Sequence, residues 1–144
     1  MWGTFGMSYS LEFKNLFLQS TSAVGGKKEF EGPLGDYLDF HYSDSYHKQK
    51  SFEDAEVMMS VDAIKIAIRK SKIENSKIKV AIGGDLSNQI AVSSGVMNKL
   101  GFPFIGVYGA CSSFILALIN AGLICHNNRN AYALAFTSSY LSNR

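Results

Sequence analysis

The 144-residue chain has few of the residues that mark specialised protein classes, with two prolines, two cysteines, three histidines and one tryptophan. So few prolines exclude a proline-rich linker protein. Acidic and basic residues nearly balance, giving a formal net charge of +2, and neither sign forms a long run. Nucleic-acid binding normally needs a clustered basic patch, so we expect no nucleic-acid partner.

Long hydrophobic runs are also missing. The longest apolar stretch, residues 114–125, is interrupted by Asn120 and Gly122. It is shorter than the roughly 20 apolar residues that span a bilayer, so it predicts a buried helix. The N-terminus has no positive charge before Lys14 and no apolar core segment. It therefore does not resemble a secretory signal, and we expect a protein that is not secreted.

Cys111 and Cys125 are predicted to be free thiols. If both lie on one helix, a rise of ~1.5 Å per residue separates them by about 21 Å. A disulfide requires Cα atoms within roughly 7 Å of each other. Free thiols fit a reducing compartment.

What the chain does have is the apolar share of an ordinary globular protein, 47%, with ten Phe and seven Tyr to fill a core. This composition excludes wholesale disorder, and the length suits about one domain. The first fifty residues are the least regular. Residues 11–18 are compatible with a strand, Gly32-Pro33 signals a turn, and 36–50 receive no firm assignment.

The next segment predicts a helix over residues 52–71. Ser51 followed by Asp54 resembles a capping box, with Asp in place of Glu or Gln. Basic residues in the last turn suit the helix dipole. Four apolar residues recur at helical spacing: Val57, Val61, Ile64 and Ile68.

Three strand-like runs follow, at 78–82, 104–108 and 131–136, and helical segments at about 89–100 and 112–125 separate them. Alternating β and α units predict an α/β fold with a parallel sheet and right-handed crossovers. Because the strands are continuously apolar, we expect helices on both faces of the sheet.

Ligands in open parallel sheets bind beyond the carboxyl ends of the strands. Three polar segments end there: GGD at 83–85, GACSS at 109–113 and TSS at 137–139. The sequence therefore gathers glycines, an aspartate, a cysteine and several hydroxyls at one edge. We interpret this edge as the candidate site.

Cys111 is the most informative residue of this edge, because it follows a strand and opens a helix. A position near unpaired N–H groups and the positive end of a helix dipole favours thiolate, as in a nucleophile or one wall of an anion site. The alternative is a small buried cysteine at a tight strand–helix junction. Cys125 is interpreted as core.

The other candidates also have two interpretations. Asp85, Asn88 and Gln89 can hydrogen-bond a ligand, but Asp after a glycine pair commonly serves a turn or an N-cap. Ser138 and Ser139 can donate to an anion or simply end their strand.

Histidines do not support catalysis at this edge. His41 and His47 lie in a segment of aromatic and charged residues, and His126 lies beside a polar loop. A Cys–His couple is therefore not visible. No pair of His, Cys or carboxylate residues has metal-ligand spacing, so we expect no metal and no cofactor.

Four motifs follow one another along the chain: EGPLGDYLD (31–39), GGDLSNQ (83–89), FIGVYGACSS (104–113) and FTSSY (136–140). In the order and spacing of these motifs, the chain resembles the stage V sporulation protein AD family, a thiolase-like component of the sporulation apparatus. The resemblance covers about residues 16–140. The resemblance implies a thiolase-like half, a mixed and mostly parallel sheet layered with helices, with residues 1–144 as a single N-terminal domain. The family is usually about twice this length, so apolar surface is expected to be exposed here.

The resemblance further implies a non-enzymatic sporulation protein that binds dipicolinic acid, alone or as its calcium chelate, and assists its uptake into the developing spore. The implied partners are other stage V sporulation membrane proteins. The implied location is cytoplasmic or peripheral at the inner forespore membrane. Formation of a homodimer is a further possibility. Cys111 matches the acyl-accepting cysteine of true thiolases, whose further catalytic residues come from a C-terminal half.

A helix N-terminus favours binding of a carboxylate. The residue pattern and the family resemblance therefore both indicate the carboxyl edge of the sheet as the binding site. The residues that we expect to contact the ligand are Cys111, Ser112, Ser113, Ser138, Ser139, Asp85 and Asn88. Two alternatives remain: an acyl-transferring thiolase or ketoacyl-synthase-like enzyme that uses Cys111, and a purely structural assembly component.

Overall fold

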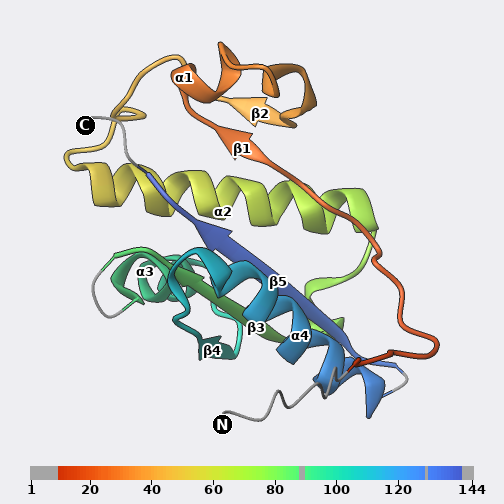
Figure 1. Cartoon of the computed structure of the whole chain (residues 1–144). Coiled ribbons are helices and arrows are strands. Elements are labelled where there is room, and N and C mark those ends of the chain that lie inside the picture. The colour runs from red at the N-terminus through yellow and green to blue at the C-terminus, as the bar shows by residue number, and fades with distance from the viewer. Residues whose placement is uncertain (1–9, 88–89, 129, 141–144) are drawn as a thin grey trace, which may run out of the picture.

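The computed structural model describes residues 10–87, 90–128 and 130–140. Its centre is a three-stranded parallel sheet of strand order β4-β3-β5, formed by β3 (Ile78–Asp85), β4 (Phe104–Gly106) and β5 (Tyr132–Ser138). Helices α2 (Phe52–Ser71) and α3 (Ala91–Leu100) cover one face, and α4 (Ser113–His126) covers the other (Figure 1). The predicted α/β class, a parallel sheet layered with helices, is confirmed.

Helix α2 has the predicted bounds because both of its ends are marked in the sequence. The backbone N–H of Asp54 donates to Ser51 Oγ at 3.0 Å, which satisfies a donor that the first turn leaves free. At the other end Lys72 adopts a left-handed conformation with φ 57° and ends the helix.

The predicted strands and helices that follow α2 are present with shifted ends. Strand β3 continues to Asp85, beyond the predicted end at Ile82, because the glycine pair stays in register with β5. Strand β4 is shorter than predicted and ends at Gly106. Helix α4 begins at Ser113, after a 3-10 turn over Ala110–Ser112.

Two apolar clusters hold the layers together. The first joins α2 and α3 to the sheet through Val57, Val61, Ile64, Ala81, Val92, Val96, Met97 and Phe136. The second joins α4 to the opposite face through Val80, Ile82, Ala117 and Ala121. The odd-numbered positions of β3 therefore face α2 and α3, and the even-numbered positions face α4.

The glycine pair at the end of β3 permits close packing on both faces. A Cβ atom at Gly83 would lie 2.3 Å from the ring of Phe136, and one at Gly84 would lie 2.0 Å from the carbonyl oxygen of Val107. Both contacts are shorter than any side chain allows, so the sheet requires glycine at these two positions.

The N-terminal region packs on α2 and stays outside the central sheet (Figure 1). It contains β1 (Val24–Gly25), α1 (Lys27–Phe30), a 3-10 turn (Gly35–Tyr37) and β2 (Phe40–His41), and β1 pairs with β2 in parallel. The predicted turn at Gly32-Pro33 is confirmed.

The interpretation of residues 11–18 as a strand is wrong, because these residues form no strand in the structure. The chain that follows runs along α2, where Ser20 Oγ donates to the carbonyl of Ala67 at 2.8 Å and Ser22 Oγ to that of Ala63 at 2.6 Å. Its polar groups therefore bond to a helix and not to a neighbouring strand.

Candidate functional site at the carboxyl edge of the sheet

The three predicted polar segments lie at the same edge of the sheet. Asp85 and Ser138, the last residues of β3 and β5, are register partners, and the N–H of Val107 after β4 donates to the carbonyl of Gly83 at 2.9 Å. Alternation places Asp85 and Ser138 on the side of α2 and α3. The turn that carries Cys111 leads into α4, on the other side.

Asp85 is fully buried, with 0% of its surface exposed. Its Oδ1 accepts from the N–H of Ser87 at 2.9 Å, and its Oδ2 accepts from the N–H of Ser93 at 2.6 Å. Both carboxylate oxygens thus bind backbone donors around the start of α3, which is the turn and cap interpretation of this residue. Asn88 and Gln89 lie outside the described residues.

Glu56 is the residue of this site that sequence reasoning missed. It is 6% exposed on α2, and its Oε1 accepts from Ser138 Oγ at 2.6 Å. Burial raises the pKa of Glu56 above its ordinary value, and the charge of Asp85 acts in the same direction, against the opposing hydrogen bond from Ser138. Glu56 directly precedes the core residue Val57, but nothing in the sequence indicates Ser138 as its partner.

The turn before α4 divides its polar groups between the interior and solvent. Ser113 is 2% exposed, and its Oγ donates to the carbonyl of Ala110 at 2.8 Å and accepts from the N–H of Gly109 at 3.1 Å. Cys111 and Ser112 are exposed, and Ser112 Oγ donates back to the carbonyl of Gly109 at 2.6 Å. The thiol of Cys111 is therefore accessible, unlike a small buried core cysteine.

Ser139 is exposed, and Thr137 donates from Oγ1 to the carbonyl of Gly84 at 2.9 Å. The candidate residues thus form two groups. Cys111, Ser112 and Ser139 are accessible from solvent, whereas Asp85 and Ser113 are committed to internal hydrogen bonds. Ser138 lies between these extremes, because its hydroxyl bonds to Glu56 and not to the backbone.

The three histidines lie in other surroundings. His41 stacks on Phe30 with ring centroids 3.6 Å apart, and His126 at the far end of α4 faces Phe13. His47 is buried against Tyr42, and this burial lowers its pKa. Within residues 10–87, 90–128 and 130–140, no histidine hydrogen-bonds Cys111, and no group of three His, Cys, Asp or Glu residues could hold a metal ion.

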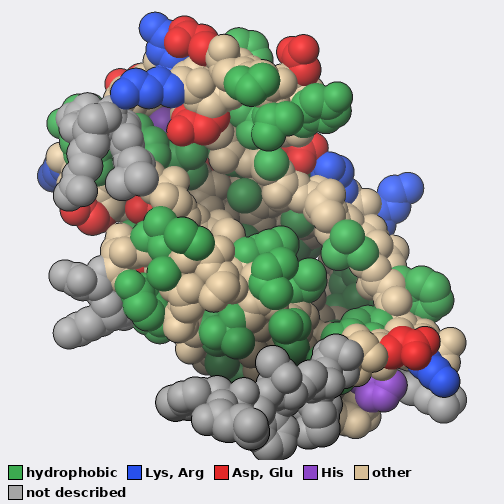
Figure 2. Space-filling view, in the orientation of Figure 1, with side chains coloured by type: hydrophobic (Ala, Val, Ile, Leu, Met, Phe, Trp, Pro, Cys, Tyr) green, Lys and Arg blue, Asp and Glu red, His purple; other side chains and the backbone are tan. Residues whose placement is uncertain are grey.

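Cys125, predicted to be core, is only half-buried. Helix α4 also exposes large apolar side chains on its outer face. Figure 2 shows hydrophobic side chains gathered on this side of the molecule. Exposed apolar patches of this kind mark interaction surfaces. The large apolar residues that α4 exposes are Phe114, Ile115, Leu116, Leu118, Ile119 and Leu123.

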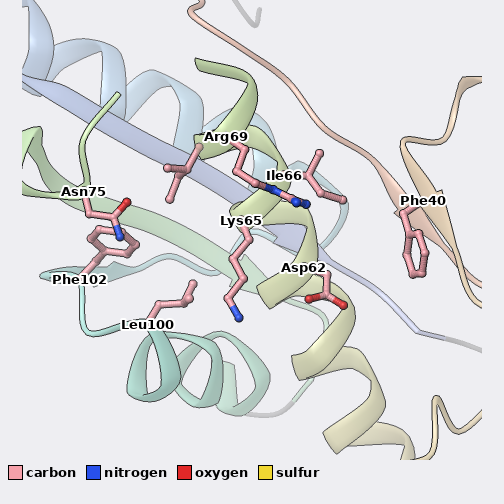
Figure 3. Close-up of a pocket in the computed structure, with 9 residues that line it drawn as sticks. Phe40, Asp62, Lys65, Ile66, Arg69, Asn75, Leu100 and Phe102 are labelled. Carbon is pink, nitrogen blue, oxygen red and sulfur yellow. The ribbon is translucent and has the colours of Figure 1, made fainter. Parts of the chain in front are cut away.

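A groove of about 560 Å³ runs beside the C-terminal half of α2, and Figure 3 shows its side chains. Phe40 lies on one side of the helix, Leu100 and Phe102 lie on the other, and Lys65 and Arg69 project from α2 itself. Since Phe102 precedes β4, this groove lies toward the amino ends of the strands, away from the candidate site. It offers two cations one helical turn apart.

No helix among the described residues is long and apolar enough to cross a membrane. Comparison with known proteins gives one family. The family model for Stage V sporulation protein AD matches residues 7–144. The chain is also 34% identical over 125 residues to the Stage V sporulation protein AD of Bacillus subtilis (strain 168). That match covers 87% of this chain and 37% of the relative, so the chain spans well under half of the relative's length.

Proposed function

The chain belongs to the Stage V sporulation protein AD family, and from that premise we propose that it is a non-enzymatic sporulation protein that binds dipicolinic acid and assists its uptake into the developing spore. Its partners in this role are other stage V sporulation membrane proteins, which it meets as a peripheral protein at the inner forespore membrane. Dipicolinate is a flat aromatic dianion, so its binding site must offer hydrogen-bond donors to carboxylates.

The observation that carries the proposal is the exposed Cys111–Ser112 turn in front of α4. A helix N-terminus points backbone N–H groups and the positive end of its dipole at an anion. The hydroxyl of Ser139 is exposed at the same edge. Each of these groups suits a carboxylate of the ligand, and the exposed Cys111 offers a contact for its aromatic ring.

The surroundings of the histidines favour binding over acyl transfer. A nucleophilic cysteine needs a base within hydrogen-bonding reach, and His41, His47 and His126 pack against aromatic rings elsewhere. Exposure to acyl-coenzyme A tests the enzyme directly. A transferable acyl group on Cys111 would replace the binding proposal by acyl-transfer chemistry.

Isothermal calorimetry of dipicolinate binding tests the proposed function. We expect saturable binding that Cys111→Ala weakens, while Cys125→Ala, at the half-buried far end of the same helix, leaves it unchanged. The groove beside α2 is the competing location, because Lys65 and Arg69 attract anions. Absence of binding, or binding lost in Lys65→Ala/Arg69→Ala and kept in Cys111→Ala, would contradict the proposed site.

A further inference from the structure

The hydrogen bond between Ser138 and Glu56 limits what the candidate site can offer to an anion. A serine hydroxyl has one proton to donate, and Ser138 donates it to Glu56 Oε1 at 2.6 Å. While Glu56 is ionised, Ser138 is therefore unable to donate to the carboxylate of a ligand. The same carboxylate also places a negative charge at the edge where a dianion would bind.

The acids around Glu56 oppose its ionisation and so favour its protonated form. Asp85 from β3 is the register partner of Ser138, and its charge, like that of Glu53 on α2, disfavours ionisation of Glu56. From α3, Ser93 donates its N–H to Asp85, but its buried Oγ has no hydrogen-bond partner. The hydrogen bonding of this cluster is thus incomplete, although nearly all buried polar groups in proteins are paired.

We infer that Glu56 controls anion binding at the carboxyl edge, and that binding of a dicarboxylate is accompanied by uptake of one proton at the Glu56 carboxylate. This inference rests on the proposed function and adds its regulation. The proton comes from solvent and forms an O–H bond on Glu56. The protonated acid then donates to Ser138 Oγ, the hydroxyl of Ser138 turns to the ligand, and one negative charge is removed from the edge.

Burial favours protonation of Glu56, because it raises the pKa of this carboxyl above its ordinary value. The ligand does not supply the proton, since dipicolinate is bound as a dianion. Glu56 acts as a positioning residue, through Ser138. A merely structural link between α2 and β5 would stabilise the fold without moving protons when ligand binds.

Calorimetry in two buffers with different ionisation enthalpies, phosphate and Tris, counts the protons taken up when dipicolinate binds. For the unchanged chain we expect uptake of up to one proton, and an affinity that falls as the pH rises, by at most about tenfold per pH unit. This measurement needs no variant, so it does not depend on how a substitution affects folding.

Glu56→Gln keeps an acceptor for Ser138 and adds an amide donor in place of the acid proton. We expect it to bind dipicolinate more tightly at about pH 8, with no proton uptake and a flat pH profile. The matched control is Glu53→Gln, an exposed acid one turn earlier on α2, which should retain proton uptake.

Three outcomes would overturn this inference while leaving the proposed function intact. They are binding without proton uptake, an unchanged pH profile in Glu56→Gln, and weaker binding of the calcium chelate in Glu56→Gln, which would make Glu56 a cation ligand. Failure of dipicolinate to bind any of the chains at any pH would instead overturn the proposed function.

Discussion

The two faces of the central sheet are completed in different ways. On one face two helices close an apolar cluster that contains Ile64, Val96 and Phe136, and the polar residues at its carboxyl end bond to each other or to the backbone. On the other face a single helix, α4, contributes mainly alanines to a smaller cluster. Its larger side chains point outward, and Cys111 at its start is exposed.

The two sides of the sheet therefore have different roles, one in the stability of the fold and the other in interaction. The cluster under α2 and α3 contains eight buried apolar residues and the cluster under α4 contains four, so we expect the first to contribute more to the stability of the fold. On the other face, α4 and the turn before it leave apolar and polar groups accessible. Ligands or other proteins can therefore bind on this side of the molecule. Substitutions on the two faces should therefore have different consequences.

The largest effect is expected in the closed cluster. Ile64→Ala removes a side chain that is 3% exposed and should lower the free energy of unfolding by about 3 kcal/mol. Leu118→Ala, on the exposed face of α4, should lower it by less than about 1 kcal/mol. Urea denaturation of both variants measures the difference. Equal losses would show that α4 is as tightly packed as α2.

The next largest effect is expected at Asp85. Asp85→Ala leaves the N–H groups of Ser87 and Ser93 without their acceptor, which should cost about 2 kcal/mol of unfolding free energy. Asp85→Asn keeps one acceptor and should recover part of this loss. If Asp85→Ala were neutral in urea denaturation, the carboxylate would not be holding the start of α3.

Some of the structural features behind these effects could be predicted from the sequence, and others could not. The bounds of helix α2 could be predicted approximately because Ser51, the apolar spacing and the basic last turn all act locally. The end of β3 could not, because glycines resemble a turn until the ring of Phe136 and the carbonyl of Val107 are placed against them. Strands β1 and β2 are too short to carry a pattern of their own.

The candidate site shows the same division. Its position at the carboxyl edge follows from the order of strands and helices, so the sequence located the three polar segments. The partners of each side chain depend on which face of the sheet it occupies and on what packs there. Glu56 was missed because an acid on a helix ordinarily lies in solvent, and only the tertiary fold brings it to Ser138.

A smaller effect, dependent on pH, is expected from Glu56→Gln. The pKa of Glu56 is raised in the folded chain, so the stabilising contribution of its neutral form is complete below the ordinary pKa of a glutamate. It is lost as the pH rises through the higher folded value. The variant lacks this loss and should gain stability relative to the unchanged chain as the pH rises from the ordinary glutamate pKa through the higher folded value. Thermal unfolding across this range would contradict the account if the two profiles were parallel.

The smallest effect on stability is expected at the accessible thiol. Cys111→Ser should change the free energy of unfolding by less than about 0.5 kcal/mol. In the unchanged chain, a thiol reagent should modify Cys111 before Cys125, because Cys125 is half-buried and burial raises its pKa. Mass spectrometry of the partially modified chain identifies the first site. Modification of Cys125 first would mean that α4 opens more readily than the turn before it.

The central claim is that the carboxyl edge of the sheet binds dipicolinate. Titration of the isotopically labelled chain with dipicolinate, followed by two-dimensional NMR of the backbone amides, tests it most directly. The account predicts saturable shifts concentrated at Cys111, Ser112, Ser113, Ser138 and Ser139. Shifts concentrated at Lys65, Arg69, Leu100 and Phe102, or none at any ligand concentration, would contradict it.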